Sequence, residues 1–283
     1  TTMATGQPAS AHGLRRSVER VPGDYLLRTV GADRRKVPAL WGLASAAGVT
    51  VGVVRWPGSF PAERVEGFML AAAEIDGERG WLYPEGALGS EEWAGDSIGI
   101  PAEGKSLIAM DAGLESIVSQ DLDALARGLT LHRVYQPELL LLHFDVVDAV
   151  AHGYWQFHDP QYQRLAGSRG RPLQEPEKVA RLGPAVARSV EFFDACLGLL
   201  MERLPERTTL LVVSSWGMRG VTMTDYLAGN LNRLLAGMGW LVTDAGGGID
   251  WSSTQAFALG DDGQCASAPF LDRRHNDPTD RTP

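Results

Sequence analysis

The chain has 283 residues, of which 44% are hydrophobic and 22% are charged, and these values exclude wholesale disorder, a collagen-like chain and a coiled coil. The 26 Lys and Arg residues against 35 Asp and Glu residues give a net charge of −9, which argues against a protein that binds nucleic acid through a basic surface. Two cysteines are too few for a disulfide framework or a cysteine-rich zinc site.

The first half of the chain predicts one helix, one buried strand and a long loop-rich stretch. A helix is expected over residues 37–47, where Gly48 is suited to end it. The β-branched run 49–56 predicts a buried strand. Residues 57–118 are rich in Gly, Pro and acidic residues, which predicts loops and short elements that form an insertion or a cover over a site.

The second half continues the alternation of helix and strand. A helix that starts at Gln120 precedes an apolar strand over residues 138–144. Residues 178–204 carry apolar side chains at steps of three and four, which predicts an amphipathic helix that begins or kinks at Pro184. Residues 208–214 predict a third buried strand. The order indicates an α/β fold with a mostly parallel sheet flanked by helices.

We expect residues 1–260 to form one α/β domain and residues 261–283, which are charged and show no strand pattern, to form an irregular tail. In parallel sheets, ligands bind beyond the carboxyl ends of the strands. Each predicted strand is followed by a distinctive loop, and the loops 55–67, 145–159 and 215–224 are expected to converge on one crevice.

No apolar run reaches the roughly 18 residues that a transmembrane helix requires. The first residues show neither the basic region nor the apolar stretch of a signal peptide. Because the chain does not begin with Met, we expect it to start inside a domain, so an export signal could precede Thr1. The sequence therefore leaves the localisation open.

The loop after the second predicted strand contains a pair of residues with metal-binding chemistry. Asp148 and His152 lie four residues apart, so on a helical turn they share a face and can ligate one divalent cation. The alternative is an acidic first turn of a helix with a hydrogen-bonded histidine. His143 is interpreted as a core residue and His158 as a turn residue.

Four sequence blocks follow one another along the chain. They are TTMATGQPASAHGL from residue 1, VGVVRWPGSFPAERVEGFML from residue 51, DAVAHGYWQFHDP from residue 148 and TTLLVVSSWGMRGV from residue 208. Together they resemble the type I phosphodiesterase/nucleotide pyrophosphatase family of the alkaline phosphatase superfamily. The resemblance implies an alkaline phosphatase-like fold, small phosphate-ester or nucleotide substrates, and hydrolysis of phosphodiester or nucleotide pyrophosphate bonds through a covalent phospho-enzyme.

The resemblance also implies divalent metals, because the family uses two, usually zinc, held by Asp and His side chains. It assigns one metal to Asp148 and His152. For the other metal the family has an adjacent Asp-His pair, where this chain has Ser215 and Trp216 as degenerate metal positions. Serine is a poor zinc ligand and the indole nitrogen of tryptophan only donates hydrogen bonds. We therefore expect at most one weak metal site.

The family's nucleophile and first strand, which carries a further metal ligand, are expected upstream of Thr1. The sheet is accordingly expected to lack its N-terminal strand, and no catalytic nucleophile is assigned within the chain. Near the predicted strand ends, the candidate substrate-pocket residues are Arg55, Trp56, Glu63 and Arg219. An arginine there could contact a phosphate oxygen, whereas the alternative for all four is packing or a solvated surface position.

Two hypotheses about function follow. The first is a metal-dependent hydrolase of phosphodiester or nucleotide pyrophosphate bonds whose activity is impaired in this chain. The second is a non-catalytic relative or fragment with at most one weak metal site. The count of ligands separates them, because Asp148 and His152 are the only family metal ligands that the sequence places.

Overall fold

The computed structural model describes residues 1–14, 18–20, 27–72, 80–87, 98–160, 175–215, 217–218, 231–244 and 249–257. The chain divides into two compact units. Unit 1 comprises Thr1–Gly6 and Pro38–Gly220, and unit 2 comprises Gln7–Val37 and Val221–Pro283. The single domain over residues 1–260 and the tail over 261–283 stay predictions, and the tail lies outside the described residues.

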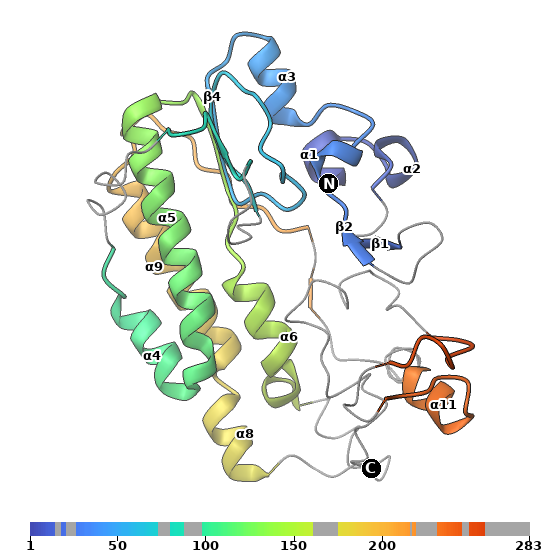
Figure 1. The fold of residues 1–283 in the computed structure, drawn as a ribbon. Coiled ribbons are helices and arrows are strands. Elements are labelled where there is room, and N and C mark those ends of the chain that lie inside the picture. The colour runs from blue at the N-terminus through green and yellow to red at the C-terminus, as the bar shows by residue number, and fades with distance from the viewer. Residues whose placement is uncertain are drawn as a thin grey trace. The chain divides into compact units, whose positions relative to one another are not determined.

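Unit 1 is built on a four-stranded sheet with the strand order β5-β4-β3-β6 (Figure 1). β3 (Val51–Val54) lies between β4 (Gly67–Leu70) and β6 (Leu139–Leu142), and both pairings are parallel. β5 (Leu82–Tyr83) pairs antiparallel with β4. The sheet is therefore mostly parallel, and the predicted α/β fold class is confirmed.

The helices of unit 1 are α1 Thr2–Thr5, α3 Leu40–Ala46, α4 Ala102–Met110, α5 Glu115–Tyr135, α6 Val146–His158, α8 Pro176–Leu182 and α9 Ala185–Met201, with a 3₁₀ turn η2 at Ala112–Leu114. The helices predicted over residues 37–47, from Gln120 and over 178–204 correspond to α3, α5 and the pair α8 and α9, whereas α4 lies in the stretch 57–118 that was expected to hold loops and short elements. The long helix expected over 178–204 is two helices that break before Pro184, because proline has no N–H to continue the ladder.

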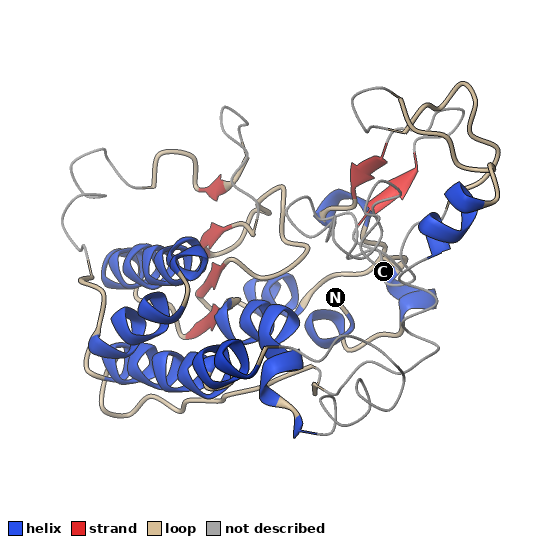
Figure 2. Cartoon of the chain, turned by 90° about the horizontal axis from the view of Figure 1, so that it is seen from below, coloured by secondary structure: helices blue, strands red, loops and turns tan. Residues whose placement is uncertain are grey.

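Helices cover both faces of the sheet, since successive strand residues point to opposite sides (Figure 2). The face toward α5 forms one buried cluster, made of Val54, Phe68, Leu70, Ala124 and Leu131. The face toward α1 and α3 forms another, made of Ala4, Ala39, Trp41, Val51, Val53, Val65, Met69 and Leu141. All four residues of β3 are accordingly buried.

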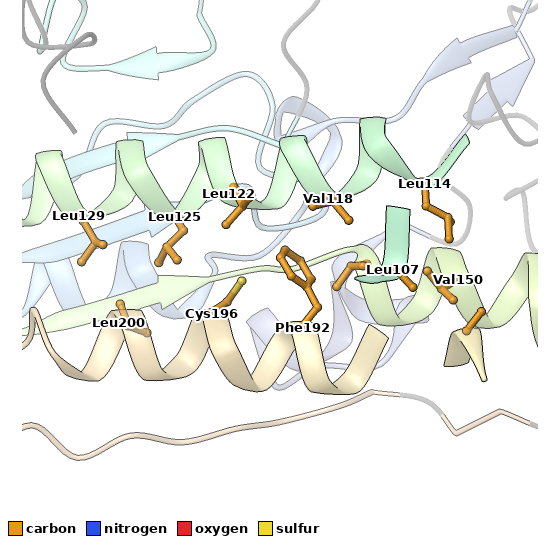
Figure 3. Packing of buried hydrophobic residues seen from close by; sticks show 12 residues of the cluster. Leu107, Leu114, Val118, Leu122, Leu125, Leu129, Val150, Phe192, Cys196 and Leu200 are labelled. Atoms are coloured by element: carbon orange, nitrogen blue, oxygen red, sulfur yellow. The ribbon is translucent and has the colours of Figure 1, made fainter. Parts of the chain in front are cut away.

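A third cluster joins the helices to one another. Figure 3 shows a row of apolar side chains on α5 that faces Phe192, Cys196 and Leu200 of α9. The row consists of Val118, Leu122, Leu125 and Leu129 of α5 and is extended by Leu114 of η2, at helical steps of three and four. Burial raises the pKa of the Cys196 thiol to about 12, so this cysteine is a neutral core residue. This cluster packs α5 against α9.

The predicted third strand over residues 208–214 is wrong. This segment has no regular structure, and Leu211, Val212 and Val213 are exposed by 79%, 59% and 63%. Its β-branched composition is suited to a strand, but a strand also needs a neighbour to pair with. Among the described residues β3 is the only neighbour of β6, and residues 208–214 pair with neither.

The exposed run predicts self-association, because apolar β-prone segments without charge readily pair with other chains. Leu211→Lys should reduce concentration-dependent light scattering and change the free energy of unfolding by no more than about 0.5 kcal/mol. Met201→Lys is the matched control, since Met201 is exposed by 62% but lies on α9. Equal effects of the two substitutions would contradict a role for the run.

Unit 2 has small elements. They are α2 (Ala9–His12), β1 (Val18–Arg20), β2 (Leu27–Thr29), a 3₁₀ turn η1 (Ala32–Arg34) and α11 (Leu231–Gly237). β1 and β2 form an antiparallel pair. His12 is buried, and its Nδ1 accepts the backbone N–H of Leu14 at 3.1 Å, which is a structural arrangement. Within the described parts of both units, no helix has the length and apolar character needed to cross a bilayer.

Candidate functional site

The carboxyl ends of β3 and β6 lie side by side, which is where parallel sheets bind ligands. The backbone N–H of His143, just after β6, donates to the carbonyl of Val54 at 3.1 Å. The backbone N–H of Arg55, just after β3, donates to the carbonyl of Leu70 at 2.7 Å. The loops that follow β3 and β6 therefore start from neighbouring points, as the sequence predicts for two of the three loops.

Asp148 and His152 lie on α6, which starts four residues after β6 ends. Asp148 is in the first turn of the helix and His152 is one turn later. The Oδ2 atom of Asp148 is 3.6 Å from Nε2 of His152, and the two side chains are 59% and 49% exposed. The structure thus brings this predicted pair together on one accessible helix face.

The pair fits part of a metal site. A carboxylate oxygen and an imidazole nitrogen at this separation are suitable donors for two positions around a divalent cation. A zinc site normally takes three or four protein ligands. In the part of the chain that the structure describes, no group of three or more His, Cys, Asp and Glu side chains is placed to hold a metal. Within the described residues, Asp148 and His152 therefore offer two donors to a cation.

The other predicted positions are only partly described. Ser215 is exposed, whereas Trp216 and Arg219 lie outside the described residues. His158, interpreted as a turn residue, is the last residue of α6. Its Nδ1 lies 3.2 Å from the carbonyl oxygen of Gly183, so it connects the end of α6 to the end of α8.

Arg55 is held in a network of acceptors. Its backbone has a positive φ of 52°, and its side chain is 19% exposed. Nη2 lies 3.0 Å from Oδ2 of Asp145, and Nη1 donates to the carbonyl of Gln120 at 3.1 Å. Nη1 also lies 3.7 Å from Oδ1 of Asp121. Two carboxylates neutralise this guanidinium, so it offers a phosphate oxygen less positive charge than an unpaired arginine would.

Asp121 and Asp145 were not predicted from the sequence. Asp121 has no exposed surface, and its oxygens accept the backbone N–H groups of Asp145 at 3.1 Å and of Val146 at 2.9 Å. Burial raises the pKa of this carboxyl to about 6, although those two hydrogen bonds and Arg55 act in the opposite direction. A signal was present, since Asp121 follows Val118 by three residues on the buried face of its helix.

His143 is half-buried and packs edge-on against Trp56, with ring centroids 6.5 Å apart. Its Nδ1 lies 3.4 Å from Oδ1 of Asp145, but the two are not aligned for a hydrogen bond. Within the described residues this buried nitrogen has no hydrogen-bond partner. Burial lowers the pKa of His143, while the charge of Asp145 raises it. His143 is thus a packed residue, as interpreted, but not a fully satisfied one.

Trp56 and Glu63 both contact Trp41 of α3. The ring of Trp56 lies 6.3 Å from that of Trp41, and the indole N–H of Trp41 donates to Oε2 of Glu63 at 2.7 Å. These contacts are the packing alternative that the sequence left open for both residues. Their part in a substrate pocket stays a prediction.

Compared with models of known protein families, residues 1–273 match that of the type I phosphodiesterase/nucleotide pyrophosphatase family. The match includes all four sequence blocks and extends over almost the whole chain. Corresponding comparisons gave no significant match to a curated protein or to a solved structure.

Proposed function

Because the chain belongs to the type I phosphodiesterase/nucleotide pyrophosphatase family, we propose that its site acts on small phosphate esters or nucleotides. We propose that Asp148 and His152 hold one divalent cation, preferably zinc, at the carboxyl edge of the sheet. We propose further that hydrolysis by this chain is slow. The reason is that Ser215 and Trp216 stand where the family has a second metal-binding pair.

The observation that supports a metal here is the 3.6 Å approach of the Asp148 carboxylate to the His152 imidazole. Both side chains are about half exposed, so a cation and its remaining water ligands have room. A bound cation would polarise a phosphoryl oxygen and neutralise charge that develops on it. The role of the two side chains is to hold and orient that charge.

The second candidate function is ligand binding without turnover. It is favoured by the two-donor character of the site within the described residues and by the exposed Ser215 hydroxyl in place of a carboxylate. A chain of this kind would bind a phosphate ester weakly through one cation and release it unchanged.

Metal binding tests the proposal directly. Equilibrium dialysis against zinc should show no more than one zinc ion per chain, and Asp148→Ala should weaken its binding at least about tenfold. Asp123→Ala is the matched control, since its carboxylate is 51% exposed and pairs with Arg127 on α5. Two tightly held zinc ions per chain, or unchanged binding in Asp148→Ala, would contradict the proposal.

The same proteins separate the two candidate functions. With zinc present, bis(p-nitrophenyl) phosphate should be hydrolysed only slowly, and turnover that Asp148→Ala removes would identify a hydrolase. Zinc-dependent binding of the ester without any turnover above that of Asp148→Ala would instead identify a binding protein.

A further inference from the structure

Helix α6 is capped by a residue from another helix. Asp145 occupies its N-cap position, but the Asp145 side chain makes no capping hydrogen bond. That carboxylate is directed instead to Arg55 at 3.0 Å and to His143 at 3.4 Å. The first two N–H groups of the helix, from Asp145 and Val146, are accepted by Asp121 of α5. Without such an acceptor, these N–H groups would lack the partner that buried backbone groups require.

Asp121 is itself fixed in place. It has no exposed surface, and the next residue, Leu122, belongs to the row that packs on α9 (Figure 3). Arg55, directly after β3, approaches Asp121 to 3.7 Å while it pairs with Asp145. One buried carboxylate therefore links β3, α5 and α6 at the carboxyl edge of the sheet.

A serine at the N-cap could accept one of these N–H groups without burial of a charge. A buried carboxylate with a single nearby guanidinium lowers the free energy of unfolding relative to such a serine, because the charge has to be desolvated. What the carboxylate supplies in addition is a fixed position for the start of α6 relative to the sheet. Asp148 lies only two residues beyond Val146, and His152 lies one turn further.

We propose that Asp121 is a positioning residue: by capping α6 from α5, it holds Asp148 and His152 in the place that a bound cation requires. The part of this inference that concerns the cation rests on the proposed function. The cap itself does not, and it can be measured without metal.

The test uses Asp121→Ala and Asp121→Asn in the full chain, with Asp123→Ala as the matched control on the same helix. In Asp121→Ala, amide hydrogen exchange at Asp145 and Val146 should accelerate at least about tenfold, and the affinity for Co²⁺ should fall by about 10–100-fold. Asp121→Asn keeps one carbonyl acceptor, so it should recover most of the Co²⁺ affinity. Asp123→Ala should match the unmodified chain in both measurements.

Val118→Ala is the control for a general loss of stability. It creates a small cavity one turn before Asp121 on the same helix and leaves the cap in place. At a temperature where it is folded, its Co²⁺ affinity should be unchanged. Equal Co²⁺ affinity in Asp121→Ala and Asp123→Ala would overturn the inference. If Asp121→Ala does not fold, Asp121→Asn decides: selective acceleration at the Asp145 amide supports the inference, and uniform exchange along α6 overturns it.

Failure of the proposed function gives a different result. If the unmodified chain binds no Co²⁺ that Asp148→Ala removes, the metal assignment fails. Hydrogen exchange then tests the cap of α6 by itself, without the metal. Acceleration confined to the first turn in the Asp121 variants supports the cap, whereas exchange equal to that of Asp123→Ala overturns it.

Discussion

Gly67→Ala is expected to destabilise unit 1 by about 4 kcal/mol or more. Gly67 begins β4 with a φ of +124°, a conformation that residues with a Cβ rarely adopt. A Cβ there would also overlap the carbonyl oxygen of Val51, its partner in the parallel ladder between β3 and β4. Backbone cannot move aside as a flexible side chain can, so the pairing itself would have to shift.

Thermal and urea unfolding of the variant would measure this loss, with Gly48→Ala as the matched control. Gly48 also has a positive φ, +83°, but no atom lies within 4 Å of the position that its Cβ would take. The control should therefore cost only about 1–2 kcal/mol, the usual penalty for a left-handed residue. An equal loss in both variants would mean that φ alone, and not the approach to Val51, requires glycine.

The same pairing explains which strands could be predicted from the sequence. The runs 49–56 and 138–144 are continuous and apolar because β3 and β6 are flanked by the packed helices, and both strands were predicted. β4 is four residues long and lies in a stretch rich in Gly, Pro and acidic residues. Its identity comes from the parallel ladder with Val51–Val54, which no local pattern reveals.

The error over residues 208–214 has the opposite origin. The run has the composition of a buried strand, yet composition describes only what a segment would do beside a partner. Its side chains are exposed, and it joins no ladder of the sheet. The strand propensity of β3 and β6 led to a correct prediction because each of these segments has a neighbouring strand to pair with.

The candidate site divides in the same way. The four-residue spacing of Asp148 and His152 is enough to place them on one helix face, and the structure has them 3.6 Å apart. Their metal role stays a prediction. The sequence predicts that Arg55 lies at a strand end. It does not reveal that Arg55 pairs with Asp121 and Asp145, which lie 66 and 90 positions later in the chain. Such contacts depend on how β3, α5 and α6 meet, which only the fold determines.

Asp121 is expected to make the folded chain lose stability as the pH rises from about 4 to about 6. Its pKa is raised from 3.8 to about 6, so in this range the folded state keeps a proton that the unfolded state releases. The free energy of unfolding therefore falls with rising pH. The contribution is fully present below the unfolded pKa and is lost above the folded one, and about two pKa units correspond to about 3 kcal/mol.

Histidine titration acts in the opposite direction and has to be separated. Burial lowers the pKa of His143 below 6.5, so the unfolded state takes up a proton more readily and acid destabilises the fold through this group.

Urea unfolding of the unmodified chain and of Asp121→Asn from pH 4 to pH 7.5 isolates Asp121, since His143 is common to both. The stability of Asp121→Asn minus that of the unmodified chain should rise by about 2–3 kcal/mol across this range. Asp123→Asn should follow the unmodified chain at every pH. Parallel curves for the unmodified chain and Asp121→Asn would show that Arg55 and the two N–H donors fully offset the burial of this carboxylate.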